Sequence, residues 1–188
     1  MSARNPEQSI MMNCAMNFGV VVGLYNIGKF CLFPLSLYST MAALLFLGLS
    51  LMVPYLIYRL TKRYRDQYCD GQVDFVRAFI FSMYTLCFGA LLASVAHYIY
   101  FAYIDCGAMV NALTQSIEQL QSIDLATMED VNVEGISQFG QYIELMKQTI
   151  QQIQDMKPID FTLGMLSNNV SWSIILSLPT ALLVKKQR

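Results

Sequence analysis

The chain is poor in charged residues. Asp, Glu, Lys and Arg make up 13% of its 188 residues, which is about half of the ~25% share in an ordinary soluble domain. The formal net charge is only −1, whereas a general nucleic-acid binder needs an excess of positive charge to neutralise phosphates. The composition therefore argues against both a soluble domain and a nucleic-acid partner.

The sequence also lacks the motifs that mark common catalytic and cofactor sites. It contains no Walker A loop, GxGxxG, HExxH or GxSxG motif. The single histidine, His97, has no second metal-type ligand near it, which favours a packed or interfacial histidine over a catalytic one. We therefore assign no catalytic, cofactor-binding or metal-binding residue from the sequence.

The cysteines show no CxxC motif and no regular spacing. Three of the five lie in apolar stretches, where cysteine behaves as a small hydrophobic residue, so a disulfide framework is not expected. The topology derived below brings Cys31 and Cys106 to the same surface, and whether these two pair is left open.

What the chain does have is long apolar runs. Hydrophobic residues make up 55% of it and lie in blocks, with a mean hydropathy of +0.44. A hydrocarbon core of roughly 30 Å needs about 20 helical residues to cross it. We therefore predict an all-α polytopic membrane protein, a single domain over residues 1–188, with four transmembrane helices at about 11–33, 37–58, 75–103 and 161–184.

Small residues recur at four-residue spacing on two of these runs. Ala15, Gly19 and Gly23 lie on the first run, and Gly89 and Ala93 lie on the third. Such spacing lets helix backbones approach closely in lipid, where van der Waals packing drives association. We interpret these residues as helix-packing positions, with packing inside one monomer favoured over a homodimer interface.

Two connections separate the last three runs. Residues 59–74 form a short basic loop. Residues 105–160 form the largest polar segment, with nine acidic residues against two basic ones. Apolar residues in its second half follow a 4-3-4-3 rhythm that is typical of helices packing side by side, which predicts an antiparallel helical hairpin; they are Phe139, Ile143, Met146, Ile150 and Ile153.

Basic residues outside the spans fall mostly on one side of the predicted topology. Arg4, five residues of 59–77 and three at the C-terminus share one side, whereas the other has Lys147 and Lys157, with Lys29 at the boundary. The positive-inside rule therefore predicts that both termini are cytoplasmic and that the acidic hairpin is outside.

Three aspartates with four-residue spacing lie among the basic residues of the middle connection. If this segment were helical, Asp66, Asp70 and Asp74 would share a face and could hold a divalent cation. Structural roles are favoured, namely ion pairs, a turn at Asp70-Gly71 and capping of the next helix by Asp74.

The same stretch and the third run carry a resemblance to a known family. The segments are YRDQYCDGQVDFVRAF and AHYIYFAYID, and they resemble a Bacteroidota-type family of four-helix inner-membrane proteins catalogued as domain of unknown function number four thousand one hundred and ninety-nine. The matching positions, together with the adjacent Arg63, are Tyr64, Arg65, Asp66, Gly71, Phe75, Ala78, Phe79, Tyr98, Tyr100, Phe101, Ile104 and Asp105, and Asp74 precedes Phe75 at the helix start.

The chain departs from the family pattern at two turns. Asp70-Gly71 stands where paired glycines are common, and Cys106 stands where a proline often follows. The resemblance covers essentially the whole chain. It implies a bacterial inner-membrane location with a periplasmic hairpin, and it implies no activity.

Three functions remain open at this stage. The leading one is a non-enzymatic scaffold or accessory subunit that contacts membrane lipids and a membrane-protein partner or a second copy, through the hairpin or the basic loop. The alternative is a small oligomeric transporter or channel using Asn13, Asn17, Asn26 and Lys29, although Lys29 can also extend to the lipid headgroups. The third is a membrane enzyme or accessory acting on lipid-linked substrates through Asp66, Asp70 and the neighbouring arginines.

Overall fold

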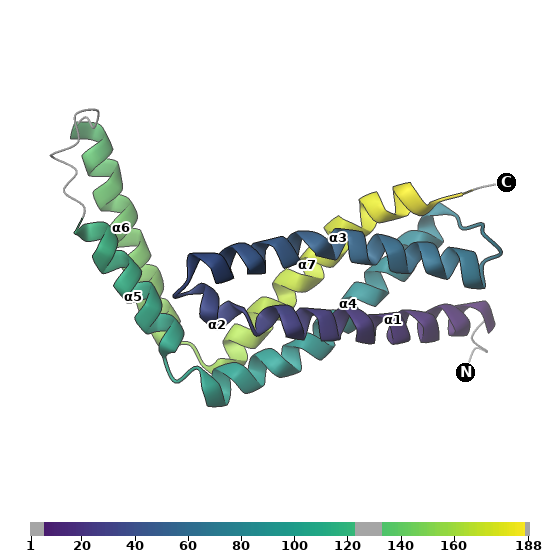
Figure 1. Cartoon of the computed structure of the whole chain (residues 1–188), viewed down its shortest axis with the longest axis horizontal. Helices are drawn as coiled ribbons and strands as arrows, with labels where there is room; N and C mark the ends of the chain where they lie inside the picture. The colour runs from purple at the N-terminus through teal and green to yellow at the C-terminus, as the bar shows by residue number, and fades with distance from the viewer. Residues whose placement is uncertain (1–5, 123–132, 187–188) are drawn as a thin grey trace.

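The computed structural model describes residues 6–122 and 133–186. Four long helices run side by side, namely α1 (Pro6–Phe30), α3 (Thr40–Tyr68), α4 (Phe75–Ile99) and α7 (Pro158–Val184) (Figure 1). A short helix, α2 (Phe33–Ser36), precedes α3, and a π-helical turn, η1 (Tyr100–Ile104), extends α4. The described residues contain no strand beyond an isolated antiparallel bridge between Val73 and Lys186. The predicted all-α class is confirmed.

Three stretches are long and apolar enough to cross a membrane: Gln8–Ser36, Thr40–Tyr68 and Phe75–Ile104. Large apolar side chains, such as Leu44, Leu91 and Leu183, point outward on the long helices, and exposed apolar surface of this extent marks contact with a membrane. The chain is thus compatible with a multi-pass membrane protein. α7 is not among the three, and its first half is more polar because it contains Asn168 and Asn169.

The second long helix extends further than the apolar run that predicts it. The run ends near residue 58, but α3 continues through the basic residues to Tyr68, because Arg, Lys and Leu are good helix formers once the chain leaves the apolar layer. The helix ends where Asp70 and Gly71 adopt positive φ angles of 48° and 75°. The N–H groups of Cys69 and Gly71 both donate to the Arg65 carbonyl there.

α1 and α4 pack at glycine-sized separation. A Cβ atom added at Gly19 would lie 2.6 Å from Phe88 Cβ, and one added at Gly89 would lie 2.7 Å from Val22 Cγ1. A Cβ atom at Gly23 would meet the Leu92 side chain at 2.7 Å. Ala15 on α1 and Ala93 on α4, two further predicted packing residues, are fully buried. All five small residues singled out from the sequence lie within this one monomer's bundle.

α4 and α7 bury small polar side chains. Ser173, Ser177 and Thr180 are buried on α7, and each hydroxyl donates to the carbonyl four residues earlier on its own helix, at 2.6–2.8 Å. Ser82 and Thr85 do the same on α4. Because each hydroxyl has a partner, the polar side chains add little cost in an apolar setting.

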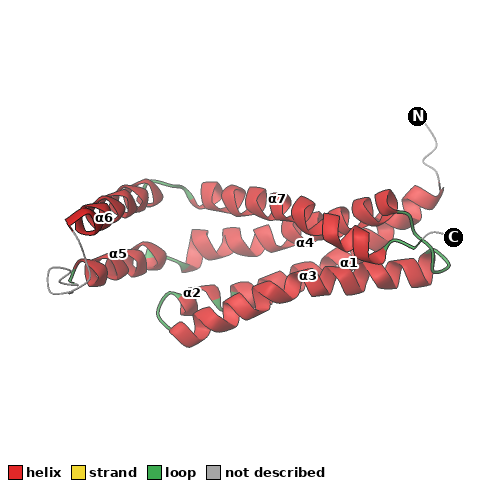
Figure 2. Cartoon of the chain, turned by 90° about the horizontal axis from the view of Figure 1, so that it is seen from above, coloured by secondary structure: helices red, strands yellow, loops and turns green. Residues whose placement is uncertain are grey.

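Two further helices, α5 (Ala108–Gln121) and α6 (Val133–Gln154), pack against each other and extend away from the four long helices (Figures 1 and 2). Their connection, residues 123–132, lies outside the described residues. Among residues 138–154 of α6, those that are not exposed are the five of the 4-3-4-3 rhythm: Phe139, Ile143, Met146, Ile150 and Ile153. The apolar periodicity therefore identified the inner face of α6.

Candidate functional site

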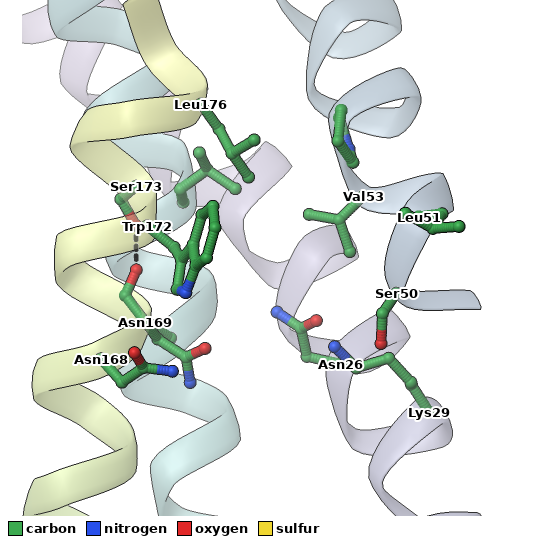
Figure 3. Close-up of a pocket in the computed structure, with 13 residues that line it drawn as sticks. Asn26, Lys29, Ser50, Leu51, Val53, Asn168, Asn169, Trp172, Ser173 and Leu176 are labelled. Carbon is green, nitrogen blue, oxygen red and sulfur yellow. Dashed lines mark hydrogen bonds between the residues drawn. The ribbon is translucent and has the colours of Figure 1, made fainter. Parts of the chain in front are cut away.

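The bundle contains a cavity of about 410 Å³ that all four long helices line. α7 and α3 form opposite sides of it, with Asn168, Asn169 and Trp172 facing Asn26, Lys29 and Ser50 (Figure 3). The volume lies toward the small end of the range of roughly 300–1,000 Å³ for ligand pockets. The cavity is therefore large enough for a small molecule or part of a lipid.

The cavity lies partway along the bundle, away from the ends of α3 and α7. α3 and α7 start at the same end of the bundle (Figure 1). Ser50 and Asn168 each lie about ten residues from the start of their helix, or about 15 Å at ~1.5 Å per residue. This distance equals half of a hydrocarbon core of roughly 30 Å, for a bilayer that begins at the start of both helices. Polar groups at that depth are costly and commonly mark functional sites.

Polar and apolar lining residues lie at opposite ends of the cavity. Asn26, Lys29, Ser50, Asn168 and Asn169 line the end nearer α2 and α5, whereas the other end is apolar. Figure 3 shows this separation, with Val53 and Leu176 at the apolar end. The separation follows from the sequence, because α3 and α7 run in the same direction. On each helix a polar lining residue, Ser50 or Asn169, precedes an apolar one, Val53 or Leu176.

Lys29 brings a positive charge to the polar end. Its side chain is half-buried, and its Nζ lies 5.5 Å from the centre of the Phe46 ring, a cation–π contact. Among the described residues no acidic group lies within ion-pair distance of Lys29. The side-chain amides of Asn26, Asn168 and Asn169 likewise form no hydrogen bond with the part of the chain that the structure describes.

A second, smaller cavity of about 210 Å³ adjoins the first and shares Asn26, Lys29, Asn168 and Asn169 with it. Its wall includes His97, which is buried against Phe30 with ring centres 4.3 Å apart. His97 Nδ1 has no hydrogen-bond partner among the described residues. The histidine is packed, as the sequence favoured, but it also adds an unsatisfied polar atom beside Lys29.

The family-motif residues of the middle connection lie at the other end of the bundle and do not line either cavity. Tyr64 is fully buried and stacks on Phe81 with ring centres 3.9 Å apart. Its hydroxyl accepts a hydrogen bond from Arg77 Nε at 3.2 Å. This cluster fastens the end of α3 to the start of α4.

Arg65 connects the same end to α7. Its Nη1 donates to the Val184 carbonyl at 3.1 Å, and its guanidinium pairs with Asp66 at 2.8 Å. The backbone bridge between Val73 and Lys186 lies beside it. Arg63, by contrast, donates only along its own helix, to Gln67 at 3.1 Å.

The remaining motif residues shape the ends of helices. Asp74 caps α4, accepting from the Arg77 backbone N–H at 3.4 Å, and Phe75 stacks loosely on Phe79. At the far end of α4, the Tyr100 hydroxyl donates to Asp105 at 3.0 Å, and the same carboxylate accepts the Gly107 and Met109 N–H groups at the start of α5. These residues stabilise the start of α4 and the connection between α4 and α5.

The structure separates the three aspartates that could together have held a cation. Asp66 pairs with Arg65, Asp70 lies in the turn and Asp74 is the cap. Among the described residues no group of three or more His, Cys, Asp or Glu side chains is arranged to hold a metal ion. Cys31 and Cys106 are both exposed, and neither forms a disulfide.

The sequence alone found only part of the cavity. Asn26 and Lys29 stood in the transporter alternative, and the structure brings them together, whereas Asn13 and Asn17 are exposed and do not line this cavity. Asn168, Asn169 and Trp172 lie in the first half of the last predicted span, at about 161–184, and were assigned to no site. An apolar helix with two adjacent asparagines about ten residues in was the signal that could have placed them deeper.

A model of the family described as "Protein of unknown function (DUF4199)" matches residues 17–186. The chain belongs to this family. The match to DUF4199 begins within α1 and ends just beyond α7. It therefore includes the residues that line both cavities and the motif residues at the ends of α3 and α4. The family identified from the motif residues is thereby confirmed. No curated protein and no solved structure matches the chain.

Proposed function

We propose that the protein crosses the bilayer four times, with α7 as the fourth span. α7 has 27 residues, which is about 40 Å of helix at ~1.5 Å per residue. Part of its polarity is turned inward, because Ser173, Ser177 and Thr180 are buried with their hydroxyls bonded to their own helix, and Asn169 lines the cavity. Ser167, Asn168 and Ser171 are exposed. Its exposed surface also carries the large apolar side chains of Ile174, Ile175, Leu178, Leu182 and Leu183.

The charge distribution supports a bacterial inner-membrane location with both termini in the cytoplasm. The basic end of α3 and the basic C-terminus lie together at one end of the bundle (Figure 1). The acidic α5–α6 pair extends from the other end, which the positive-inside rule assigns to the periplasm.

We propose that the protein is a non-enzymatic membrane protein that binds a ligand in the cavity between its helices. The observation that carries this proposal is the presence of Lys29, without an acidic partner among the described residues, beside three asparagine amides in a cavity between the proposed spans. A cation in that position is costly unless something pairs with it. Binding of this kind is the first step of the transporter alternative.

Native mass spectrometry of the protein released from its own membrane in mild detergent tests this proposal. Wild type is expected to carry a bound small molecule or lipid as an added mass. Ser50→Phe fills the cavity and is expected to lose that mass, whereas Met52→Phe, on an exposed part of α3 outside the cavity lining, keeps it. Wild type without an added mass, or equal masses on both variants, would count against a binding role.

An accessory-subunit role has its own supporting observation. Tyr142 and Leu145 are exposed on α6, beside the apolar face that packs against α5. Aromatic and apolar residues in such positions are typical of protein contacts. A photo-crosslinking residue at position 142, in native membrane, is expected to capture a distinct protein if this role holds. Crosslinks only to lipid would remove it.

A further inference from the structure

The separation of polar and apolar groups in the cavity defines the shape of molecule that suits it. One end presents Lys29 with the amides of Asn26, Asn168 and Asn169, and the other presents Val53 and Leu176. A ligand that is polar throughout would leave the apolar end unfilled, and an apolar one would leave the amides unpaired. Both mismatches carry a free-energy cost.

The charge at the polar end selects the sign of the ligand. Lys29 is the cationic residue in the lining, and the lining contains no Asp or Glu. Among the described residues none with a negative charge lies within ion-pair distance of Lys29. An anionic group in the cavity would supply the missing partner, and the three amides can donate hydrogen bonds to its oxygens.

The cavity is also accessible from the side. Leu51, Pro54 and Trp172 line it and are exposed at the surface of the bundle. At this depth the surroundings of the bundle are acyl chains, so a lipid chain can enter between α3 and α7 without passing through water.

We propose that the cavity binds an anionic amphiphile, with its acidic head on Lys29, Asn26, Asn168 and Asn169 and its acyl chain against Val53 and Leu176. This inference rests on the binding role proposed above and assigns the ligand class. The head points toward α5 and α6, and the chain points toward the basic end of the bundle. A free fatty acid and an anionic bilayer lipid share this chemistry.

Trp172, the single tryptophan of the chain, reports on this site directly because it lines the cavity. The purified protein is placed in bilayers of zwitterionic lipid, and its fluorescence is quenched by a fatty acid brominated in mid-chain. The methyl ester of the same acid is the neutral comparison. Both are titrated by mole fraction in the bilayer, so that background lipid contact is matched. The pH is high enough to ionise the acid and low enough to keep Lys29 protonated.

The acid is expected to half-quench wild type at a mole fraction about tenfold lower than the ester. Lys29→Met keeps the length of the side chain and is expected to abolish that difference. Lys29→Arg is expected to retain it, and Lys147→Met, on exposed α6, leaves it unchanged. The second pair is brominated phosphatidylglycerol, which is anionic, and brominated phosphatidylcholine, which is zwitterionic. The pair with the larger difference in quenching between its two members identifies the source of the ligand, a free fatty acid or a bilayer lipid.

Two results would overturn the inference, and they differ in whether the proposed binding role also fails. In the first result, the charged and neutral members of both pairs quench wild type equally, and more strongly than they quench Ser50→Phe. This result shows a ligand site that does not distinguish ligands by charge. The binding role then survives and the anionic class fails. Quenching in wild type that matches Ser50→Phe for every ligand removes the binding role as well.

Discussion

Gly19 and Gly28 lie on the same helix but have opposite surroundings. A Cβ atom on Gly19 would clash with Phe88 at 2.6 Å and approach the Thr85 carbonyl at 3.2 Å. A Cβ atom on Gly28 would meet no atom within 4 Å. Substitutions at Gly19 test the packing role of glycine, whereas substitutions at Gly28 test only its low helix propensity.

Gly19→Ala is expected to destabilise the protein by about 1–3 kcal/mol, the usual cost of overpacking a filled interface. Gly28→Ala is expected to be neutral or to stabilise by up to about 1 kcal/mol, because alanine is the better helix former. Thermal unfolding in mild detergent measures both. Similar effects at the two positions would contradict the close α1–α4 contact.

Lys29 shows where prediction from a single sequence reached its limit. Its place near the end of an apolar run is compatible with a side chain that extends to the headgroups. Asn168 and Asn169, which line the same cavity, are about 140 residues away in sequence, in the first half of the last predicted span. Local periodicity and hydropathy describe one helix at a time, so they cannot show which faces meet.

At the scale of elements, apolar periodicity was more informative about which face of a helix is buried than about where the helix ends. It identified the inner face of α6 and the α1–α4 packing residues. It ended α3 ten residues too early, at residue 58, because hydropathy reports the apolar layer and not the helix. The first predicted run, which ended at about residue 33, also continued past the end of α1 at Phe30.

A side-chain hydrogen bond joins the end of α3 to the end of α7, which gives an element-scale prediction. Arg65→Met removes the hydrogen bond from Nη1 to the Val184 carbonyl. A hydrogen bond from a charged donor contributes about 1.5–3 kcal/mol, so amide exchange in the last turn of α7 is expected to accelerate by about tenfold or more.

Hydrogen–deuterium exchange of peptides covering residues 178–186 measures this effect. Arg63→Met is the matched control, because Arg63 donates only to Gln67 on its own helix. Unchanged exchange in Arg65→Met, or the same acceleration in both variants, would show that this contact does not hold α7.

At the scale of the whole molecule, the number of spans decides which side of the membrane each end faces. Cys106 is exposed beside α5, and Lys186 lies just past α7 at the opposite end of the bundle. With four spans the two positions are on opposite sides. With α7 outside the bilayer they share one side.

Labelling with a membrane-impermeant maleimide distinguishes these arrangements. In variants whose other cysteines are replaced, Cys106 is expected to react in intact spheroplasts. Lys186→Cys, in a background without Cys106, is expected to react only after lysis. Reaction of both from outside would contradict the four-span arrangement and the cytoplasmic C-terminus.

The inward-facing polar side chains of α7 have a consequence for how the protein is made. Alone in lipid, α7 would present Asn168, Asn169 and Ser173 to acyl chains, whereas in the bundle Ser173 is buried and Asn169 lines the cavity. α4 leaves the ribosome well before α7. In the four-span arrangement, α7 therefore enters the membrane as a dependent segment, guided by a surface that earlier helices have already formed, so damage to α4 delays or prevents completion of the topology itself.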